Sequence, residues 1–269
     1  MVKILSIDDR PIAKLPYRFA SKEREVSIGS LDILTGVVDC LPKDLDCLVV
    51  TSDLQARENS GDRLLGEVVP EVLENILLQR SLNPDNAGVF LAGDFYTTQD
   101  LSTRGGLGDV RSVWCAFDSK FKWVTGVAGN HDSFGDSKTA ALQFRKTPNI
   151  NLLDGDSARV DDFLISGIGG IIGNASKPMR RSDIEFTKLL KQLLENRPDI
   201  FISHLGPNVS NMKLNGDASI RRELARYKHP LLYICGHTHW KNQAFAQLSK
   251  YVQILNVDMR VVVLQRESD

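Results

Sequence analysis

Four of the five histidines in this chain lie in a set of short polar segments, and other members of the set carry aspartate, asparagine or glutamine. A lone histidine is more often a hydrogen-bonded structural residue than a ligand, but four of five in such segments indicate a site. Carboxylate, amide and imidazole groups that converge are the ligand set of a pair of divalent metal ions. The segments are residues 52–55, 93–94, 129–132, 203–204 and 236–239.

At least four of these segments directly follow an apolar run that is typical of a buried β-strand. The carboxyl ends of the strands in an open α/β sheet are where such folds place their binding sites. We therefore expect the polar segments to meet at one edge of a sheet. The apolar runs are residues 47–51, 87–92, 123–127, 200–202 and 231–235.

Two of the segments are more specific than the others. A plain turn explains the glycine and asparagine of segment 129–132, but it does not explain the histidine and aspartate that follow them. His237 and His239 are two residues apart, so in a loop or strand each can serve a different metal ion. Taken alone, Asp94 after Gly93 is more typical of a turn or a helix cap than of a site, and Asp53 is ambiguous in the same way.

The composition is that of an ordinary globular protein. Of the 269 residues, 42% are hydrophobic and 25% are charged, and the formal net charge is −1. This balance gives no strong signal for nucleic acid or an anionic membrane, and no apolar run approaches the roughly 20 residues that span a bilayer. The start of the chain reads as a short strand, not as a signal peptide. We interpret the four cysteines as buried free thiols in a reducing compartment and expect a cytoplasmic location.

Residues 47–130 repeat one unit of apolar strand, polar loop, amphipathic helix and next strand, which is typical of a parallel sheet. We place Pro70 in the first turn of the first helix and expect a shorter helix near residues 110–118. Residues 97–109 contain three glycines and are predicted to form a mobile loop beside Asp94. The apolar positions of the first helix are Val68, Val69, Val72, Leu73, Ile76 and Leu77.

Short alternating strands are expected in the second half of the chain, together with a helix that opens at the Ser182–Glu185 capping box and ends at Pro198. We find no linker or internal repeat, so we expect one domain over residues 1–269. Its motif core spans about 47–240, and residues 1–46 form an N-terminal extension packed on it. The expected strands are residues 150–153, 157–160, 163–168, 200–202, 252–257 and 260–264.

The ordered set of five segments resembles the calcineurin-like metallophosphoesterase superfamily, over about residues 47–240. The resemblance implies an α/β fold, a four-layer αββα sandwich of two mixed sheets. It also implies a metal-dependent phosphoesterase that hydrolyses a phosphomonoester or phosphodiester by attack of metal-bound hydroxide. The expected substrate is a phosphorylated small molecule or a phosphodiester. The expected cofactors are two divalent metal ions, Mn²⁺ first, with Fe, Zn, Ni or Mg as alternatives.

The resemblance assigns a role to each matching position. The bridging ligand of both metals is Asp94, and His131 is the general acid for the leaving oxygen, with Asp132 supporting its orientation. The ligands of the first metal are Asp53, His239 and the residue at position 55. The ligands of the second metal are Asn130, His204 and His237.

Position 55 departs from the family pattern, because the family usually reads Asp-x-His where this chain has Asp53-Leu54-Gln55. A glutamine carbonyl is a harder and weaker ligand than imidazole, so it favours Mn²⁺ or Mg²⁺ over Zn²⁺ or leaves the first site weak. The departure motivates an alternative function: a scaffold or interaction module with weakened catalysis. A rival first segment at Asp8 follows the N-terminal strand, but it lies outside the strand–helix series that begins at residue 47.

Three further residues are candidates for binding the substrate. Arg104 flanks the glycine-containing loop, and Arg181 lies in a short basic stretch. Trp240 follows His239 and can stack on a base or sugar, although packing against the sheet is an equal alternative.

Overall fold

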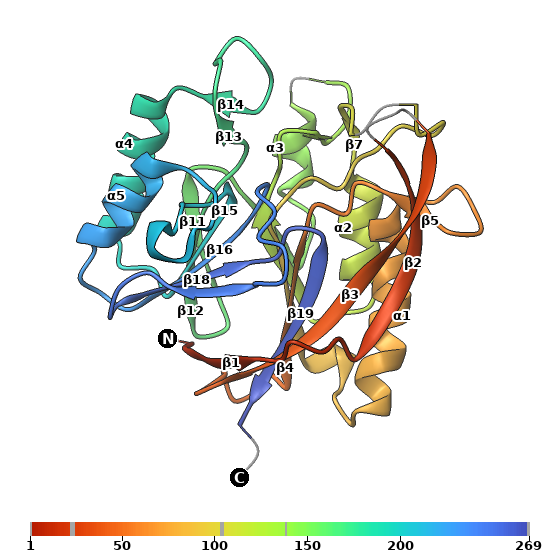
Figure 1. The fold of residues 1–269 in the computed structure, drawn as a ribbon, viewed down its shortest axis with the longest axis horizontal. Helices are drawn as coiled ribbons and strands as arrows, with labels where there is room; N and C mark the ends of the chain where they lie inside the picture. The colour runs from red at the N-terminus through yellow and green to blue at the C-terminus, as the bar shows by residue number, and fades with distance from the viewer. Residues whose placement is uncertain (1, 22–24, 103–104, 138, 268–269) are drawn as a thin grey trace.

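The computed structural model describes residues 2–21, 25–102, 105–137 and 139–267. The chain forms two main sheets with helices on their outer sides (Figure 1). The larger sheet has the strand order β10-β8-β6-β4-β19-β3-β2-β5, and β1 also pairs with β3. Its strands are β1 (Ile4–Ile7), β2 (Ala13–Ala20), β3 (Val26–Val38), β4 (Cys47–Ser52), β5 (Arg57–Glu58), β6 (Ala87–Leu91), β8 (Trp123–Val127), β10 (Ile150–Leu153) and β19 (Arg260–Arg266).

Strands β4, β6, β8 and β10 run parallel to one another. All residues of β4, β6 and β8 are buried, as expected for strands covered on both faces. Strand β19 runs antiparallel to β4 and parallel to β3. The carboxyl ends of β4, β6 and β8 therefore share one edge of the sheet, beside the start of β19.

The smaller sheet has the strand order β11-β12-β15-β16-β18-β17. The four strands β12, β15, β16 and β18 are parallel, and each outer strand is antiparallel to its neighbour. Both sheets are therefore mixed. The strands are β11 (Asp156–Val160), β12 (Phe163–Ile168), β15 (Ile200–Leu205), β16 (Leu231–Gly236), β17 (Phe245–Gln247) and β18 (Val252–Asn256).

The remaining elements are helices and two short strand pairs. The pairs are β7 (Gly108–Asp109) with β9 (Asp132–Ser133), and β13 (Ile171–Ile172) with β14 (Arg180–Arg181). The α-helices are α1 (Leu65–Gln79), α2 (Arg111–Asp118), α3 (Ala140–Phe144), α4 (Asp183–Glu195) and α5 (Ala218–Arg226), and the 3-10 turns are η1 (Pro84–Asn86) and η2 (Ser210–Met212).

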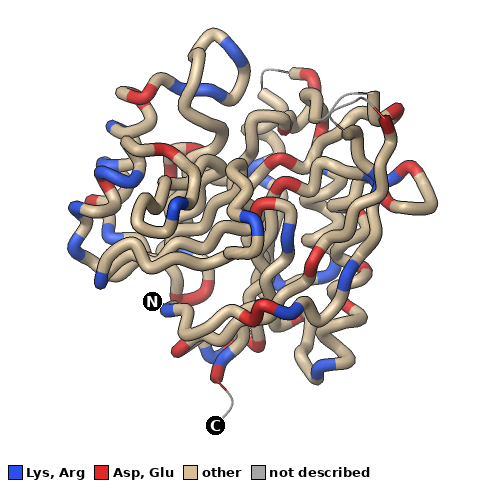
Figure 2. Tube along the Cα trace, in the orientation of Figure 1, with Lys and Arg blue, Asp and Glu red and all other residues tan. Residues whose placement is uncertain are grey.

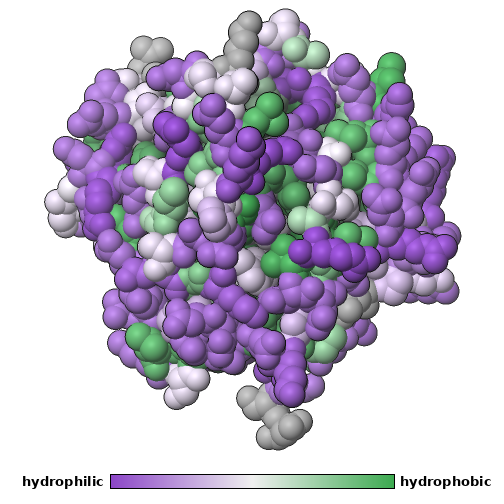
Figure 3. Space-filling model, turned by 180° about the vertical axis from the view of Figure 1, so that it is seen from behind, coloured by the Kyte–Doolittle hydropathy of each residue, from purple (hydrophilic) through white to green (hydrophobic). Residues whose placement is uncertain are grey.

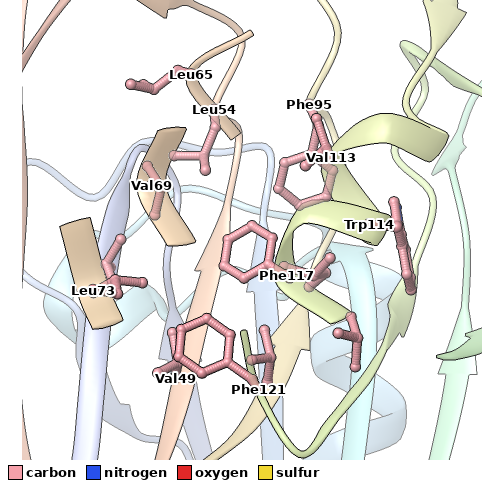
Figure 4. Packing of buried hydrophobic residues seen from close by; sticks show 14 of the residues in the cluster. Val49, Leu54, Leu65, Val69, Leu73, Phe95, Val113, Trp114, Phe117 and Phe121 are labelled. Atoms are coloured by element: carbon pink, nitrogen blue, oxygen red, sulfur yellow. The ribbon is translucent and has the colours of Figure 1, made fainter. Parts of the chain in front are cut away.

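Buried apolar side chains form three clusters between these layers. The first lies between α1, α2 and the larger sheet, where Leu73 and Phe117 pack above Val49 (Figure 4). The second holds Phe90 from the larger sheet and Ile202 from the smaller sheet, so it lies between the two sheets. The third lies between the smaller sheet and helices α4 and α5. This order agrees with the αββα arrangement expected from the sequence.

Most predicted elements are present at or within a few residues of their expected bounds. The helix near 110–118 is α2, and Ser182 and Glu185 form the predicted capping box of α4. The position of Pro70 was wrong: α1 begins at Leu65, so Pro70 lies in its second turn. There it cannot donate the usual helical hydrogen bond to the Gly66 carbonyl.

Two other expectations need correction. Strand β10 does not pair with the short alternating strands that follow it. It pairs in parallel with β8 and ends the larger sheet. The thiols are all free, but only Cys47 and Cys235 are buried, whereas Cys40 and Cys115 are exposed. Burial raises the pKa of Cys47 to about 12, so this thiol stays protonated.

Charged residues of both signs are mixed over the molecule (Figure 2). The face seen from behind is mostly hydrophilic, with apolar residues in small groups (Figure 3). Among the described residues, no helix is long and apolar enough to cross a membrane.

Candidate metal centre

The polar segments predicted from the sequence meet where the carboxyl ends of strands from both sheets come together. Asp53 follows β4, and Asp94 lies three residues after β6. Asn130 lies three residues after β8 in the same sheet. His204 lies within β15, and His237 directly follows β16, so these two imidazoles come from the smaller sheet.

Tight backbone turns bring these side chains together. Asp53, Asp94 and His237 have φ angles of 58°, 62° and 63°, in the left-handed region that side chains other than glycine adopt rarely. Such conformations cost about 1–3 kcal/mol each and persist where the surrounding structure fixes them, commonly at functional sites. Gly129 allows the closest approach, since a Cβ atom there would lie 2.0 Å from Oδ1 of Asp94.

Asp94, His204 and His237 form a compact cluster whose potential ligand atoms all lie within 4.8 Å of one another. Nε2 of His204 lies 3.1 Å from Oδ2 of Asp94 and 3.2 Å from Nδ1 of His237. Nδ1 of His204 donates to the Ala92 carbonyl at 2.8 Å. This bond leaves Nε2 directed at the cluster, as is usual for a histidine that ligates a metal.

The neighbouring donors also fit a metal. Asn130 is 8% exposed, and its Oδ1 is a buried oxygen with no hydrogen-bond partner among the described residues. Because buried polar atoms are normally paired, an unpaired amide oxygen beside carboxylates and imidazoles fits a ligand position. Asp53 is 6% exposed, and its Oδ2 accepts from the Ser52 hydroxyl at 2.6 Å and from the His237 N–H at 2.9 Å.

The electrostatics of the cluster show how strongly it favours positive charge. Burial raises the pKa of Asp53 well above its ordinary value. Burial also opposes charge on His204, but the Asp94 and Asp53 carboxylates outweigh it and raise the pKa of this imidazole to about 10. Desolvation and the His204 charge lower the pKa of His237 to about 4. Without a cation, the carboxylates are thus balanced by a proton on His204, and metal binding would release it.

Gln55 and His239, two of the predicted ligands of the first metal, contact different carboxylates. Gln55 is 9% exposed, and its Nε2 donates to Oδ2 of Asp94 at 3.0 Å. His239 is outside the compact cluster, and its Nδ1 donates to Oδ2 of Asp258 at 2.8 Å. The sequence analysis missed Asp258, although it lies two residues after β18 in another polar segment at a strand end. A carboxylate behind a histidine fixes the ring and its tautomer.

His131 and Asp132 lie beside the cluster but contact different partners. The His131 backbone N–H donates to Oδ1 of Asp94 at 2.9 Å, and Nδ1 of its ring contacts the Gly106 carbonyl. The Asp132 carboxylate accepts from the N–H groups of Asp94, Phe95 and Gly129 at 2.7–2.8 Å. Burial and the Asp94 charge raise the pKa of Asp132 to about 6. Asp132 therefore joins two strand-end loops.

The predicted substrate-binding residues lie apart from the cluster or outside the described residues. Arg104 is outside the described residues. Nη2 of Arg181 contacts both Asp154 oxygens at 2.8 Å, and Nη1 donates to the Gly169 carbonyl, so its guanidinium is occupied within the protein. Trp240 is 2% exposed and donates to the Asn215 carbonyl, which leaves little of its ring for stacking.

A comparison with protein families agrees with this geometry. The family model described as calcineurin-like phosphoesterase matches residues 48–241, most of the chain and all five polar segments. The chain belongs to this family. Phosphoester hydrolysis with divalent metal ions is the general chemistry of calcineurin-like phosphoesterases, and the cluster of Asp94, His204 and His237 could hold a metal ion.

Two solved structures that resemble this chain share little of its sequence. The 5'-nucleotidase of Candida albicans is 14% identical with a TM-score of 0.40, over 81% of this chain and 46% of the nucleotidase. This chain thus matches less than half of that protein. A hypothetical protein from Thermus thermophilus is 14% identical with a TM-score of 0.44, over 78% of this chain and 75% of its own. No curated protein matches the chain.

Proposed function

We propose that this calcineurin-like phosphoesterase hydrolyses a phosphomonoester or phosphodiester at two divalent metal ions. The observation that carries the proposal is the buried group of Asp94, His204 and the unpaired Asn130 oxygen at the joined strand ends. Asp94 would contact both metals, with Asn130, His204 and His237 around the second. Asp53, His239 and Gln55 would hold the first. When bound, such metals supply Lewis-acid charge stabilisation and an activated water.

We assign the proton for the leaving oxygen to His131. Its backbone is fixed by Asp94, and its Nδ1 is engaged by the Gly106 carbonyl. With Nδ1 engaged in this way, Nε2 is the ring nitrogen that would be left to act on the leaving oxygen. His131 would thus act as a proton donor without being a metal ligand.

Gln55 supports Mn²⁺ or Mg²⁺ as the physiological ion in this proposal, because an amide oxygen is a harder ligand than imidazole. The same residue favours the second candidate function, a scaffold with weakened catalysis. In the structure its amide N–H₂ donates to Asp94. Rotation of the amide would present the oxygen to a cation instead.

Metal analysis combined with hydrolysis assays tests the proposal. We expect about two Mn²⁺ per chain after loading, and cleavage of bis-p-nitrophenyl phosphate or p-nitrophenyl phosphate. Asp94→Asn should lower kcat by at least about 100-fold, since the bridging charge holds both cations. Asp85→Asn is the matched control, because Asp85 lies in η1 at the opposite end of β6.

Cleavage of neither substrate, together with identical behaviour of Asp94→Asn, would contradict the proposal. Failure to bind metal after supplementation would favour the scaffold. Metal binding lost in Asp94→Asn, but kept in Asp85→Asn, would support the assigned centre even if the two test substrates are poor ones.

A further inference from the structure

A large hollow adjoins the predicted first metal site. Its volume is about 1140 Å³, and it lies between the N-terminal strands of the larger sheet and the loops that follow η2 and β16. His239, a proposed ligand of the first metal, is one of its lining residues. Much of one wall comes from residues before position 48, outside the segment that matches the family. Lining residues used below are Asp8, Asp32, Lys213, His239, Lys241 and Arg260.

Arg260 is the unusual member of this lining. Arg260 is 6% exposed, yet its guanidinium forms no ion pair with any described residue. Nε donates to the Asp258 carbonyl at 3.3 Å and Nη2 to the Lys241 carbonyl at 2.8 Å. No described residue accepts a hydrogen bond from Nη1. A buried charge is costly unless it is paired, so an unpaired guanidinium beside a hollow points to an anionic ligand.

Asp258 and Asp32 attract the charge of Arg260, but neither carboxylate accepts a hydrogen bond from its guanidinium. Asp32 lies opposite Arg260 in the pairing of β3 with β19, but its carboxylate pairs with Lys14 at 3.4 Å. Asp258 is two residues away along the chain, and its carboxylate accepts from His239. Asp8 accepts a hydrogen bond from the Thr35 hydroxyl. The guanidinium of Arg260 therefore retains a free hydrogen-bond donor at Nη1.

Two exposed lysines extend the positive charge of Arg260 along one side of the hollow. Lys213 follows η2 and Lys241 follows the segment of His239, whereas the acidic lining residues come from the N-terminal part of the chain: Asp8 and Asp9 follow β1, and Asp32 lies in β3. The two walls therefore carry opposite charge. Arginine binds phosphate and carboxylate groups through paired N–H donors, and flanking lysines add to the attraction.

We propose that Arg260 binds a second anionic group of the substrate while the scissile phosphoester lies at the metal centre. The substrate class is then a phosphoester that carries another phosphate or a carboxylate. This inference rests on the proposed function for the reaction itself. Anion binding at Arg260 does not depend on metal, so the two proposals can fail separately.

Calorimetric titration of the metal-free protein with inorganic phosphate tests the anion site. We expect saturable binding by the EDTA-treated wild type, and at least about tenfold weaker binding by Arg260→Gln, as for the loss of one charge-assisted hydrogen bond. Arg260→Lys should lie between them, because it keeps the charge and loses the fork. Arg266→Gln, at the other end of the same strand, is the matched control and should bind like the wild type.

Equal affinity in the wild type and a folded Arg260→Gln, or no saturable binding by the wild type, would overturn the proposal. If Arg260→Gln does not fold by circular dichroism, wild-type affinity in Arg260→Lys overturns it instead. With Mn²⁺ bound, the KM for adenosine 3',5'-bisphosphate should be about tenfold below that for adenosine 5'-monophosphate, and Arg260→Gln should remove this difference. Phosphate binding at Arg260 without hydrolysis of either substrate would contradict the proposed reaction and support the anion site.

Discussion

Gln55 is the residue at which this chain differs most informatively from its family. The side chain is buried and already contacts the carboxylate that is proposed to bridge the metals. Gln55 therefore lies in direct contact with the proposed site, even though it is not the expected histidine. Whether it acts as a ligand or as a hydrogen-bond donor changes which ion the centre selects.

We expect Gln55→His to raise zinc affinity by about tenfold, or about 1.4 kcal/mol, because imidazole is a better zinc ligand than an amide. Competition with a zinc indicator measures this, and Gln79→His, at the exposed end of α1, is the control. Unchanged zinc affinity would show that residue 55 does not ligate. A fall in Mn²⁺-dependent activity with higher zinc affinity would show that the glutamine is needed for the reaction.

The residues around the centre differed in how far the sequence could predict them. The motif positions were predictable because each follows a strongly apolar run, and such a run places its polar successor at a strand end. Asp258 and Arg260 were not, because their roles depend on β19 lying between β4 and β3, a long-range pairing that local patterns do not encode. Trp240 was ambiguous, and its burial shows a packing role.

Among the elements, the hairpin of β2 and β3 was the main structure that the sequence analysis missed. Pro16 lies inside β2 and argues against a strand. In β3, Val26 and Ile28 are 54% and 72% exposed, whereas Leu31 and Ile33 are fully buried. The apolar residues of β3 are thus exposed in its first half and buried in its second half, because the first half projects past the core.

The two loops after β6 and β8 depend on one carboxylate. Asp132 accepts three backbone N–H groups from these loops, and an asparagine has only one acceptor oxygen to offer them. We therefore expect Asp132→Asn to lower the free energy of unfolding by about 1–3 kcal/mol. Urea unfolding of the metal-free protein measures this, with the exposed Asp136→Asn as control. If Asp132→Asn lost no more unfolding free energy than Asp136→Asn, the loops would hold their geometry without Asp132.

At the scale of the whole molecule, the segment that matches the family is smaller than the folding unit. Residues 48–241 omit β17, β18 and β19, and also β1, β2 and β3. Strand β19 is central in the larger sheet, between β4 and β3. Its side chains Val261 to Leu264 are fully buried in the clusters on both sides of that sheet.

We expect a chain of residues 47–241 to be insoluble or to lack cooperative thermal unfolding. Removal of β19 would leave β4 as an unpaired apolar edge, which promotes aggregation. Calorimetry and size-exclusion chromatography measure this, and residues 2–267 are the control. A monomeric 47–241 chain that melts cooperatively would contradict this role for β19.

The metal centre draws Asp94 from one sheet and His204 and His237 from the other. A cation held by these residues would be a further cross-link between two halves of the molecule that meet through apolar packing and through hydrogen bonds such as that of His204 to the Ala92 carbonyl. Release of the cation by these side chains would then be coupled to separation of the two sheets. The occupancy of the centre would therefore set how independently the two sheets can open, as well as the chemistry between them.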